Sequence, residues 1–212
     1  MVWKIWYYLI MNKIDKIYES NNGIKEFASE YVKYVNSVIQ GIANSKIDEF
    51  VSVILNAREK QSTIYFIGNG GSASTASHFA NDISIGTREH IKPFRAISLC
   101  DNQAITTAIA NDDGFDYIFS DQLSVLIKKE DVLVAISASG NSINLINAVA
   151  KAKELGATSV GITSFDGGKL KKIVDVSIHI PTGNGEYGPA EDSHLVIDHL
   201  VSNYLQRYVK SV

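Results

Sequence analysis

Two short loops rich in glycine and serine, each directly after an apolar run, constrain the fold of this chain most. The first, GNGGSAS at 68–74, follows the apolar run at 64–67, and the second, SASGNS at 137–142, follows the run at 132–136. Glycine lets a backbone approach a ligand closely, and the helix expected after each loop offers unpaired N–H groups and a positive dipole end to an anion. The two loops together predict a site for one small, hydroxyl-rich anion such as a sugar phosphate.

Short apolar runs alternate with helical patterns along the rest of the chain. The runs predict five strands, at 63–67, 95–99, 132–136, 159–162 and 174–180. The patterns between them predict helices at 72–85, 115–128 and 142–155. Such alternation is typical of an α/β fold, here a three-layer sandwich around a mainly parallel five-stranded sheet of the flavodoxin-like or Rossmann-like kind. Helical spacing of apolar residues predicts further helices at 24–44, 47–60 and 191–209.

The chain reads as one domain over 11–212. An amphipathic helical segment at 24–60 lies outside the expected sheet and has to bury its apolar face, and an interface between copies of the chain is a suitable place. Residues 1–10 hold both tryptophans and differ from the polar, helix-compatible sequence that begins at Met11. They are too short to span a bilayer and lack the small-residue cleavage site of a signal peptide. We expect them to be a non-native or disordered extension, with Met11 as the biological start.

Charge and cysteine content restrict the partners and the compartment. A net charge of −3, from 20 basic and 23 acidic residues, gives no general attraction to nucleic acid or to an anionic membrane. Cys100 is the single cysteine, so no intramolecular disulfide can form and a cytoplasmic location is expected. We interpret Cys100 as a buried, small apolar residue.

The first loop also meets the loose form of the dinucleotide-binding fingerprint, through Gly68, Gly70 and Ala73. That fingerprint expects an acidic residue at the end of the next strand, about 20 residues on. Here Asp101 follows the loop by about 30 residues. The serine-rich second loop has no place in a simple nicotinamide site, so a sugar phosphate is favoured over a dinucleotide.

Two clusters of ionisable residues are candidates for chemistry. His78 and Asp82 are four residues apart on the helix expected after the first loop, so they share a face and can meet one metal ion or one substrate. A second cluster in the C-terminal helix contains Glu191, His194 and His199. We assign His194 to ordinary helix packing and His199 to the site.

These motifs together resemble the SIS (sugar isomerase) family, most closely the phosphoheptose isomerases, which act on sedoheptulose 7-phosphate. The resemblance rests on FIGNGGSAS at 66–74, HFA at 78–80 and ISASGNS at 136–142, with support from ANDDGF at 110–115 and TSFDGGK at 163–169. It extends from about residue 24 to the C-terminus. It implies isomerisation of sedoheptulose 7-phosphate to D-glycero-D-manno-heptose 7-phosphate, for heptose in lipopolysaccharide or another surface glycan.

The resemblance also implies a zinc ion, one per site, held by His78, Asp82, Glu191 and His199. Asp82 and His199 are then the acid–base pair, and Glu191 assists them or holds the metal. Two departures stand out, because the family normally has glutamate at the position of Asp82 and glutamine at that of Glu191. In one continuous helix Glu191 and His199 would lie about 12 Å apart along the axis. Glu191 therefore has to lie at or before the start of the helix, or a second subunit has to contribute.

The resemblance also implies a homotetramer with sites between subunits, which is typical of the family. It implies the residues that bind the substrate as well. Serines of the two loops are expected to bind phosphate, and polar residues near them to bind sugar hydroxyls; the full set is Asn69, Gly70, Gly71, Ser72, Asp101, Asn102, Ser137, Ser139 and Ser142.

Two other functions stay open. Some SIS proteins bind a phosphosugar or a partner protein without catalysis, which loss of the catalytic carboxylate and histidine would indicate; this chain keeps Asp82, Glu191 and His199. The turn-rich stretch at 181–189 departs from the family and is expected to line the far end of the sugar. An isomerase of another phosphosugar is therefore the remaining alternative.

Overall fold

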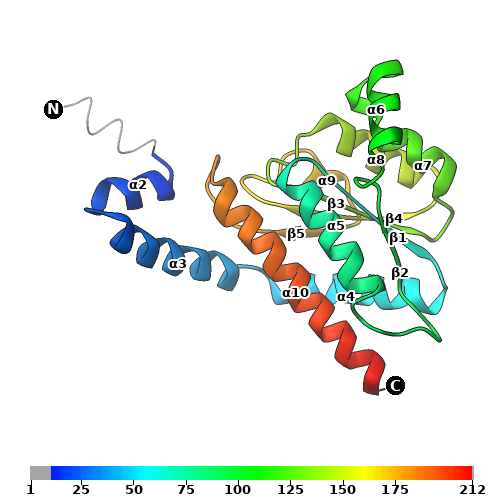
Figure 1. Cartoon of the computed structure of the whole chain (residues 1–212), viewed down its shortest axis with the longest axis horizontal. Helices are drawn as coiled ribbons and strands as arrows, with labels where there is room; N and C mark the ends of the chain where they lie inside the picture. The colour runs from blue at the N-terminus through cyan, green and yellow to red at the C-terminus, as the bar shows by residue number, and fades with distance from the viewer. Residues whose placement is uncertain (1–10, 212) are drawn as a thin grey trace.

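The structure is a computed structural model that describes residues 11–211, and the expected extension at 1–10 lies outside them. Within this range the chain forms an α/β sandwich (Figure 1). Its five strands are β1 (Thr63–Gly68), β2 (Arg95–Ser98), β3 (Val132–Ser137), β4 (Thr158–Thr163) and β5 (Val176–His179). The strand order is β2-β1-β3-β4-β5 and all the pairings are parallel, so the expected mainly parallel five-stranded sheet is confirmed.

Helices cover both faces of the sheet, as the alternating pattern predicted. One face packs against α4 (Asn44–Glu59), α5 (Gly71–Ser84) and α10 (Tyr187–Ser211). The other packs against α7 (Ser120–Leu126), α8 (Ile143–Glu154) and α9 (Leu170–Ile173). Strand residues divide between the two cores by alternation, because successive side chains point to opposite faces. In β1, Ile64 and Phe66 face the first core, and Tyr65 and Ile67 face the second.

Several helix boundaries differ from the sequence prediction. The expected helix at 115–128 is a short 3₁₀ turn, η1 (Phe115–Tyr117), followed by α7. Gly114, at φ 109°, precedes that turn. The C-terminal helix begins at Tyr187, not at 191. Pro189 lies in its first turn, where a missing N–H costs nothing, so this proline is compatible with the earlier start. The helices α2 (Lys13–Ser20), α6 (Gln103–Asp112) and α9 were not predicted.

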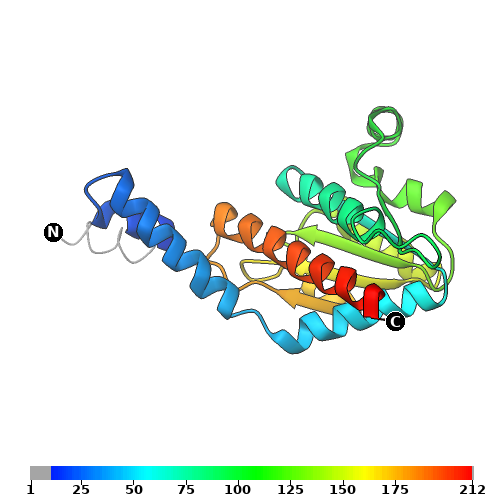
Figure 2. The same cartoon turned by 60° about the horizontal axis from the view of Figure 1, so that its bottom comes forward.

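The helices α2 and α3 (Ile24–Gln40) project from the body of the molecule as an N-terminal arm (Figures 1 and 2). One buried carboxylate fastens this arm to the loop before α10. Glu186, which is 2% exposed, accepts hydrogen bonds from the backbone N–H of Lys13 at 2.5 Å, from the hydroxyl of Tyr34, and from the N–H of Gly183 at 2.7 Å. Burial and this carboxylate raise the pKa of Tyr34, so its hydroxyl remains a donor.

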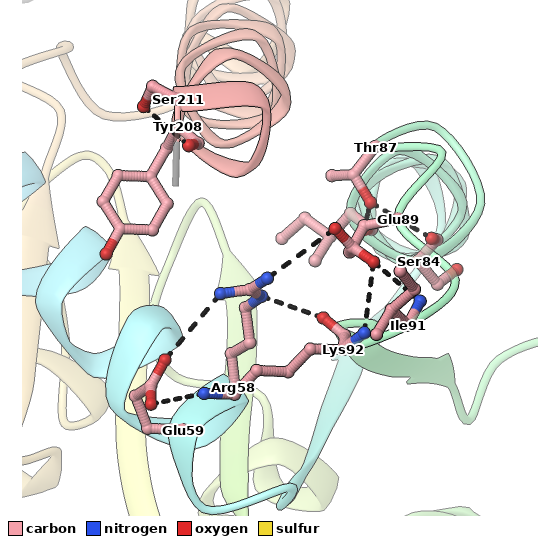
Figure 3. Close-up of polar contacts among 10 residues, drawn as sticks. Arg58, Glu59, Ser84, Thr87, Glu89, Ile91, Lys92, Tyr208 and Ser211 are labelled. Atoms are coloured by element: carbon pink, nitrogen blue, oxygen red, sulfur yellow. Dashed lines mark hydrogen bonds and ion pairs between the residues drawn. The ribbon is translucent and has the colours of Figure 1, made fainter.

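A buried arginine fixes the loop that follows α5. Figure 3 shows the Arg58 guanidinium between Glu59 and Glu89, at 3.7 and 3.9 Å, with its Nε donating to the carbonyl of Lys92 at 2.9 Å. The guanidinium also lies 5.3 Å from the ring centroid of Phe94. These contacts hold the 86–94 segment against α4, and so position the C-terminal end of α5.

Among residues 11–211, no helix is both long enough and apolar enough to cross a membrane.

Candidate functional site

A pocket of about 140 Å³ lies at the carboxyl ends of β1 and β3. These are the neighbouring strands between which the strand order reverses, since β1 connects to β2 on one side and β3 leads to β4 on the other. Ligands of open parallel sheets bind at this kind of position. We call it the anion pocket, and it is lined by Asn69, Ser72, Ile136, Ser137, Ala138, Ser139, Ser142, Leu145, Tyr187 and Glu191.

Three helices begin at the anion pocket. Ser72 lies in the first turn of α5, Ser142 is the N-cap residue of α8, and Tyr187 is the first residue of α10. The first turn of a helix carries N–H groups without intrahelical partners, and its dipole end is positive. The pocket therefore suits a phosphate group, which needs several donors at once.

Side-chain amides connect the two loops that form the pocket. Asn69 donates to Asn144 at 3.0 Å, and Asn144 donates back to Asn69 at 2.9 Å. In the second loop, the hydroxyl of Ser137 accepts from the N–H of Gly140 at 3.1 Å. Gly140 has φ 65°, and a β-carbon there would stand 2.1 Å from the carbonyl oxygen of Gly167, so only glycine fits.

The helices α5 and α10 lie side by side and run in the same direction (Figures 1 and 2). Near their N-terminal ends, the carboxylate of Glu191 packs against Gly71, where a β-carbon would stand 2.4 Å from the nearest carboxylate oxygen. About two to three turns further along both helices, a second group of polar side chains meets. We call this group the His/Asp cluster: His78 and Asp82 from α5, with Asp198 and His199 from α10.

The His/Asp cluster has the composition and spacing of a metal site. One ligand atom from each of its four residues lies within 4.8 Å of the other three. The Nε2 atom of His78 is 3.3 Å from Nε2 of His199, 3.5 Å from Oδ2 of Asp82 and 3.9 Å from Oδ2 of Asp198. Imidazole nitrogens and carboxylate oxygens are ligands that zinc and similar divalent ions accept in proteins. The donor set therefore fits a divalent metal ion.

Burial shifts two titratable groups of α10. The side chain of Asp198 is fully buried, and burial first and the neighbouring Asp82 second raise its pKa to about 8. His194 is also fully buried, which lowers its pKa to about 4. Its Nε2 atom lies 3.4 Å from the hydroxyl of Ser164, while Nδ1 has no hydrogen-bond partner among the described residues. A neutral His194 that packs in the core agrees with its predicted structural role.

The predicted site residues divide into three groups. Asn69, Ser72, Ser137, Ser139, Ser142 and Glu191 line the anion pocket, with Gly70 and Gly71 in the turn that begins α5. The predicted metal ligands His78, Asp82 and His199 meet in the His/Asp cluster, whereas Glu191 lies at the anion pocket. Asp101 and Asn102 line neither: Asp101 accepts a hydrogen bond from Ser77 of α5, and Asn102 is the N-cap of α6, accepting from the N–H of Ile105 at 3.1 Å.

Three polar residues at the site were not predicted. Asn144 lies two positions after the second loop, and nothing in the local sequence indicated its contact with Asn69, which is 75 residues away. Tyr187 belongs to the turn-rich stretch at 181–189, which was expected at the far end of the sugar, and it lines the anion pocket. Asp198 directly precedes His199 and could have been found by considering every carboxylate within one turn of that histidine.

Comparison with known proteins agrees with this arrangement. The model of the SIS domain family matches residues 30–164. A phosphoheptose isomerase of Helicobacter pylori strain P12 is 36% identical over 76% of this chain and 83% of its own length, and one of Geobacter metallireducens is 35% identical over 76% and 85%.

Solved structures lead to the same family. A phosphoheptose isomerase structure from Neisseria gonorrhoeae superposes with a TM-score of 0.77 at 28% identity, and the match covers 86% of this chain and 98% of that one. Both loops at the anion pocket and the His78–Asp82 pair fall within the residues that the family model matches. The chain therefore belongs to the SIS domain family and, within it, to the phosphoheptose isomerases.

Proposed function

We propose that this isomerase converts sedoheptulose 7-phosphate to D-glycero-D-manno-heptose 7-phosphate in the cytoplasm, for the heptose of a surface glycan. The observation that carries the proposal is that the anion pocket and the His/Asp cluster lie at two levels of the same helix pair, α5 and α10. Gly71 and His78 are separated by about 10 Å along α5. An extended seven-carbon chain with a terminal phosphate has a similar length, about 10 Å. The phosphate can therefore occupy the anion pocket while the reacting carbons lie at the His/Asp cluster.

The reaction moves one proton between neighbouring carbons and one between their oxygens, so no atom is gained or lost. We assign the carbon-bound proton to Asp82, whose carboxylate removes it from C1 of the ketose and returns it to C2. His199 moves the proton between the oxygens, and Glu191 assists from the pocket side. General acid–base groups of this kind contribute about 10²- to 10⁴-fold each.

We propose Zn²⁺ as the ion of the His/Asp cluster, since two imidazoles with carboxylates form an ordinary zinc set. His78, Asp82 and His199 are common to the set that the family implies and the set that this fold brings together. The bound ion would polarise the substrate carbonyl and stabilise negative charge on its oxygen. Asp82 is one methylene shorter than the family glutamate, so its reach toward the sugar depends on how closely the sugar lies to α5.

We also propose that the chain assembles as a homotetramer. The N-terminal arm exposes large apolar side chains, with Tyr18, Ile24 and Val32 at 71%, 76% and 66% exposure. A second copy of the chain is a natural cover for such a surface. Light scattering coupled to size-exclusion chromatography should give four times the mass of the chain, and a mass equal to one chain would overturn the assembly.

An NMR assay of the purified chain with sedoheptulose 7-phosphate, with and without added zinc, tests the function. We expect turnover, a loss of at least about 100-fold in kcat for Asp82→Asn, and no loss for the control Asp121→Asn, which lies on α7 away from the site. Retained turnover in Asp82→Asn would contradict the assignment of the base. Thermal stabilisation by the sugar phosphate without turnover would indicate a binding protein, and turnover of only a hexose phosphate would indicate a different substrate.

A further inference from the structure

Asp198 is a buried carboxylate with no hydrogen bond to either oxygen. Its side chain is fully buried on α10, and both Oδ1 and Oδ2 have no hydrogen-bond partner among the described residues. A carboxyl group removed from water without a hydrogen-bond partner is unfavourable in either protonation state, and coordination of a metal ion satisfies such a group. The Oδ2 atom of Asp198 lies 3.9 Å from Nε2 of His78. Asp198 therefore points to a cation between itself and the histidines.

The distances within the His/Asp cluster agree with one shared ion. Ligand atoms at about 2.1 Å from a tetrahedral zinc ion are about 3.4 Å from one another. The corresponding distances from Nε2 of His78 are 3.3, 3.5 and 3.9 Å. The Nε2 atoms of His78 and His199 lie 3.3 Å apart, a separation that suits two imidazoles sharing one metal ion.

Glu191, in contrast, is not one of the residues whose ligand atoms meet in this cluster. It precedes His199 by eight residues in one continuous helix, which corresponds to about 12 Å along the axis. Its carboxylate packs against Gly71 and lines the anion pocket. Within one chain, the metal ion therefore needs a fourth ligand other than Glu191, the residue that the family resemblance implies.

We propose that Asp198 is the fourth metal ligand of this chain, in the place that the resemblance gives to Glu191, and that Glu191 serves the substrate pocket. The proposal rests on the proposed function for the identity of the ion, Zn²⁺, but it requires no catalysis. It predicts that metal binding depends on Asp198 and is independent of Glu191, whereas turnover depends on both.

The test measures zinc affinity of the full chain after removal of metal with a chelator. Competition with a zinc-binding dye should show at least a tenfold weaker affinity for Asp198→Asn, and a change of less than about twofold for Glu191→Ala, which removes every possible ligand atom at that position of the same helix. Unchanged affinity in Asp198→Asn, or lost affinity in Glu191→Ala, would overturn the proposal. Turnover is measured separately, so a chain that binds zinc as proposed but does not isomerise the sugar contradicts only the proposed function.

A second variant decides the question if Asp198→Asn does not fold. Asp198→Cys supplies a thiolate, which on Co²⁺ gives an intense thiolate-to-metal band in the near ultraviolet. The band should appear in Asp198→Cys and be absent both from Glu191→Cys and from the natural chain, whose Cys100 serves as the internal control. Its absence from Asp198→Cys, or its presence in Glu191→Cys, would overturn the assignment.

Discussion

The side-chain amides of Asn69 and Asn144 form two reciprocal hydrogen bonds, at 3.0 and 2.9 Å, between the loop after β1 and the helix after β3. The two residues are 75 positions apart in sequence. The loop of Asn69 leads into α5, and Asn144 lies in α8, on the opposite face of the sheet. Asn144 is only 2% exposed, so the pair is protected from competing water. It therefore sets the width of the anion pocket.

Replacement of Asn144 by alanine should widen this pocket. We expect KM for the sugar phosphate to rise about tenfold and the free energy of unfolding to fall by about 2 kcal/mol, since the amide of Asn69 loses its partner. Steady-state kinetics and urea denaturation measure the two effects. Asn147→Ala, one turn later on α8, is the matched control and should leave KM unchanged; equal KM values for both variants would show that the pair does not shape the pocket.

Gly71→Ala should displace the carboxylate of Glu191, because the new methyl group would stand 2.4 Å from it. Since that carboxylate is the end of a flexible side chain, stability should change by less than about 1 kcal/mol, while kcat/KM falls clearly. The effect should largely vanish when Gly71→Ala is made in a Glu191→Ala background, since interacting residues are not additive. Fully additive losses in this double-mutant cycle would mean that Gly71 acts on something other than Glu191.

Arg58→Met should destabilise the fold and leave the site intact. The variant keeps most of the side-chain volume but removes the hydrogen bond to the carbonyl of Lys92 and the contact with the ring of Phe94. A loss of about 2 kcal/mol is expected from a charge-assisted hydrogen bond of this kind. Lys60→Met, which removes an exposed ion pair with Glu130 at 3.4 Å, is the control and should cost less than about 1 kcal/mol. A kcat that falls together with stability would contradict a purely structural role.

The buried His194 should make the fold sensitive to mild acid. Its pKa is lowered to about 4 in the folded chain, so between that value and the ordinary value near 6.5 the unfolded chain binds more protons. Its contribution is constant above pH 6.5 and is lost as the pH falls, by about 2 kcal/mol at pH 5. Urea denaturation at pH 7 and pH 5 should show a smaller decline for His194→Leu than for the natural chain. Parallel declines would mean that other groups govern the acid sensitivity.

The sheet and both loops were predictable because their signals are local. Each strand is a short apolar run, and β1 and β3, which carry the loops, are buried on both faces. The spacing of His78 and Asp82 likewise fixes their common face on one helix. By contrast, α6 is only 10 residues long and has no buried residue, so its few apolar side chains gave no clear signal of a helix packed on the sheet.

The composition of the His/Asp cluster required the packing of two helices. Asp198 and His199 are neighbours in sequence and point about 100° apart on α10, so helical spacing alone does not place both beside His78. They meet it because α5 and α10 pack side by side and in the same direction. The same packing places Glu191 beside Gly71. Its separation from His199 along the axis is the one expected for two residues eight positions apart in a continuous helix.

Glu186 connects the N-terminal arm, where we propose that subunits meet, to the wall of the anion pocket. Its buried carboxylate holds the start of α2 and the hydroxyl of Tyr34 on the N-terminal arm, and the next residue in the chain is Tyr187 in the wall of the anion pocket. In the proposed tetramer, a neighbouring subunit packed on the arm would restrain the pocket wall through Glu186 and the adjoining peptide bond. By thermodynamic reciprocity, a sugar phosphate that restrained Tyr187 would then strengthen the contact between subunits to the same degree.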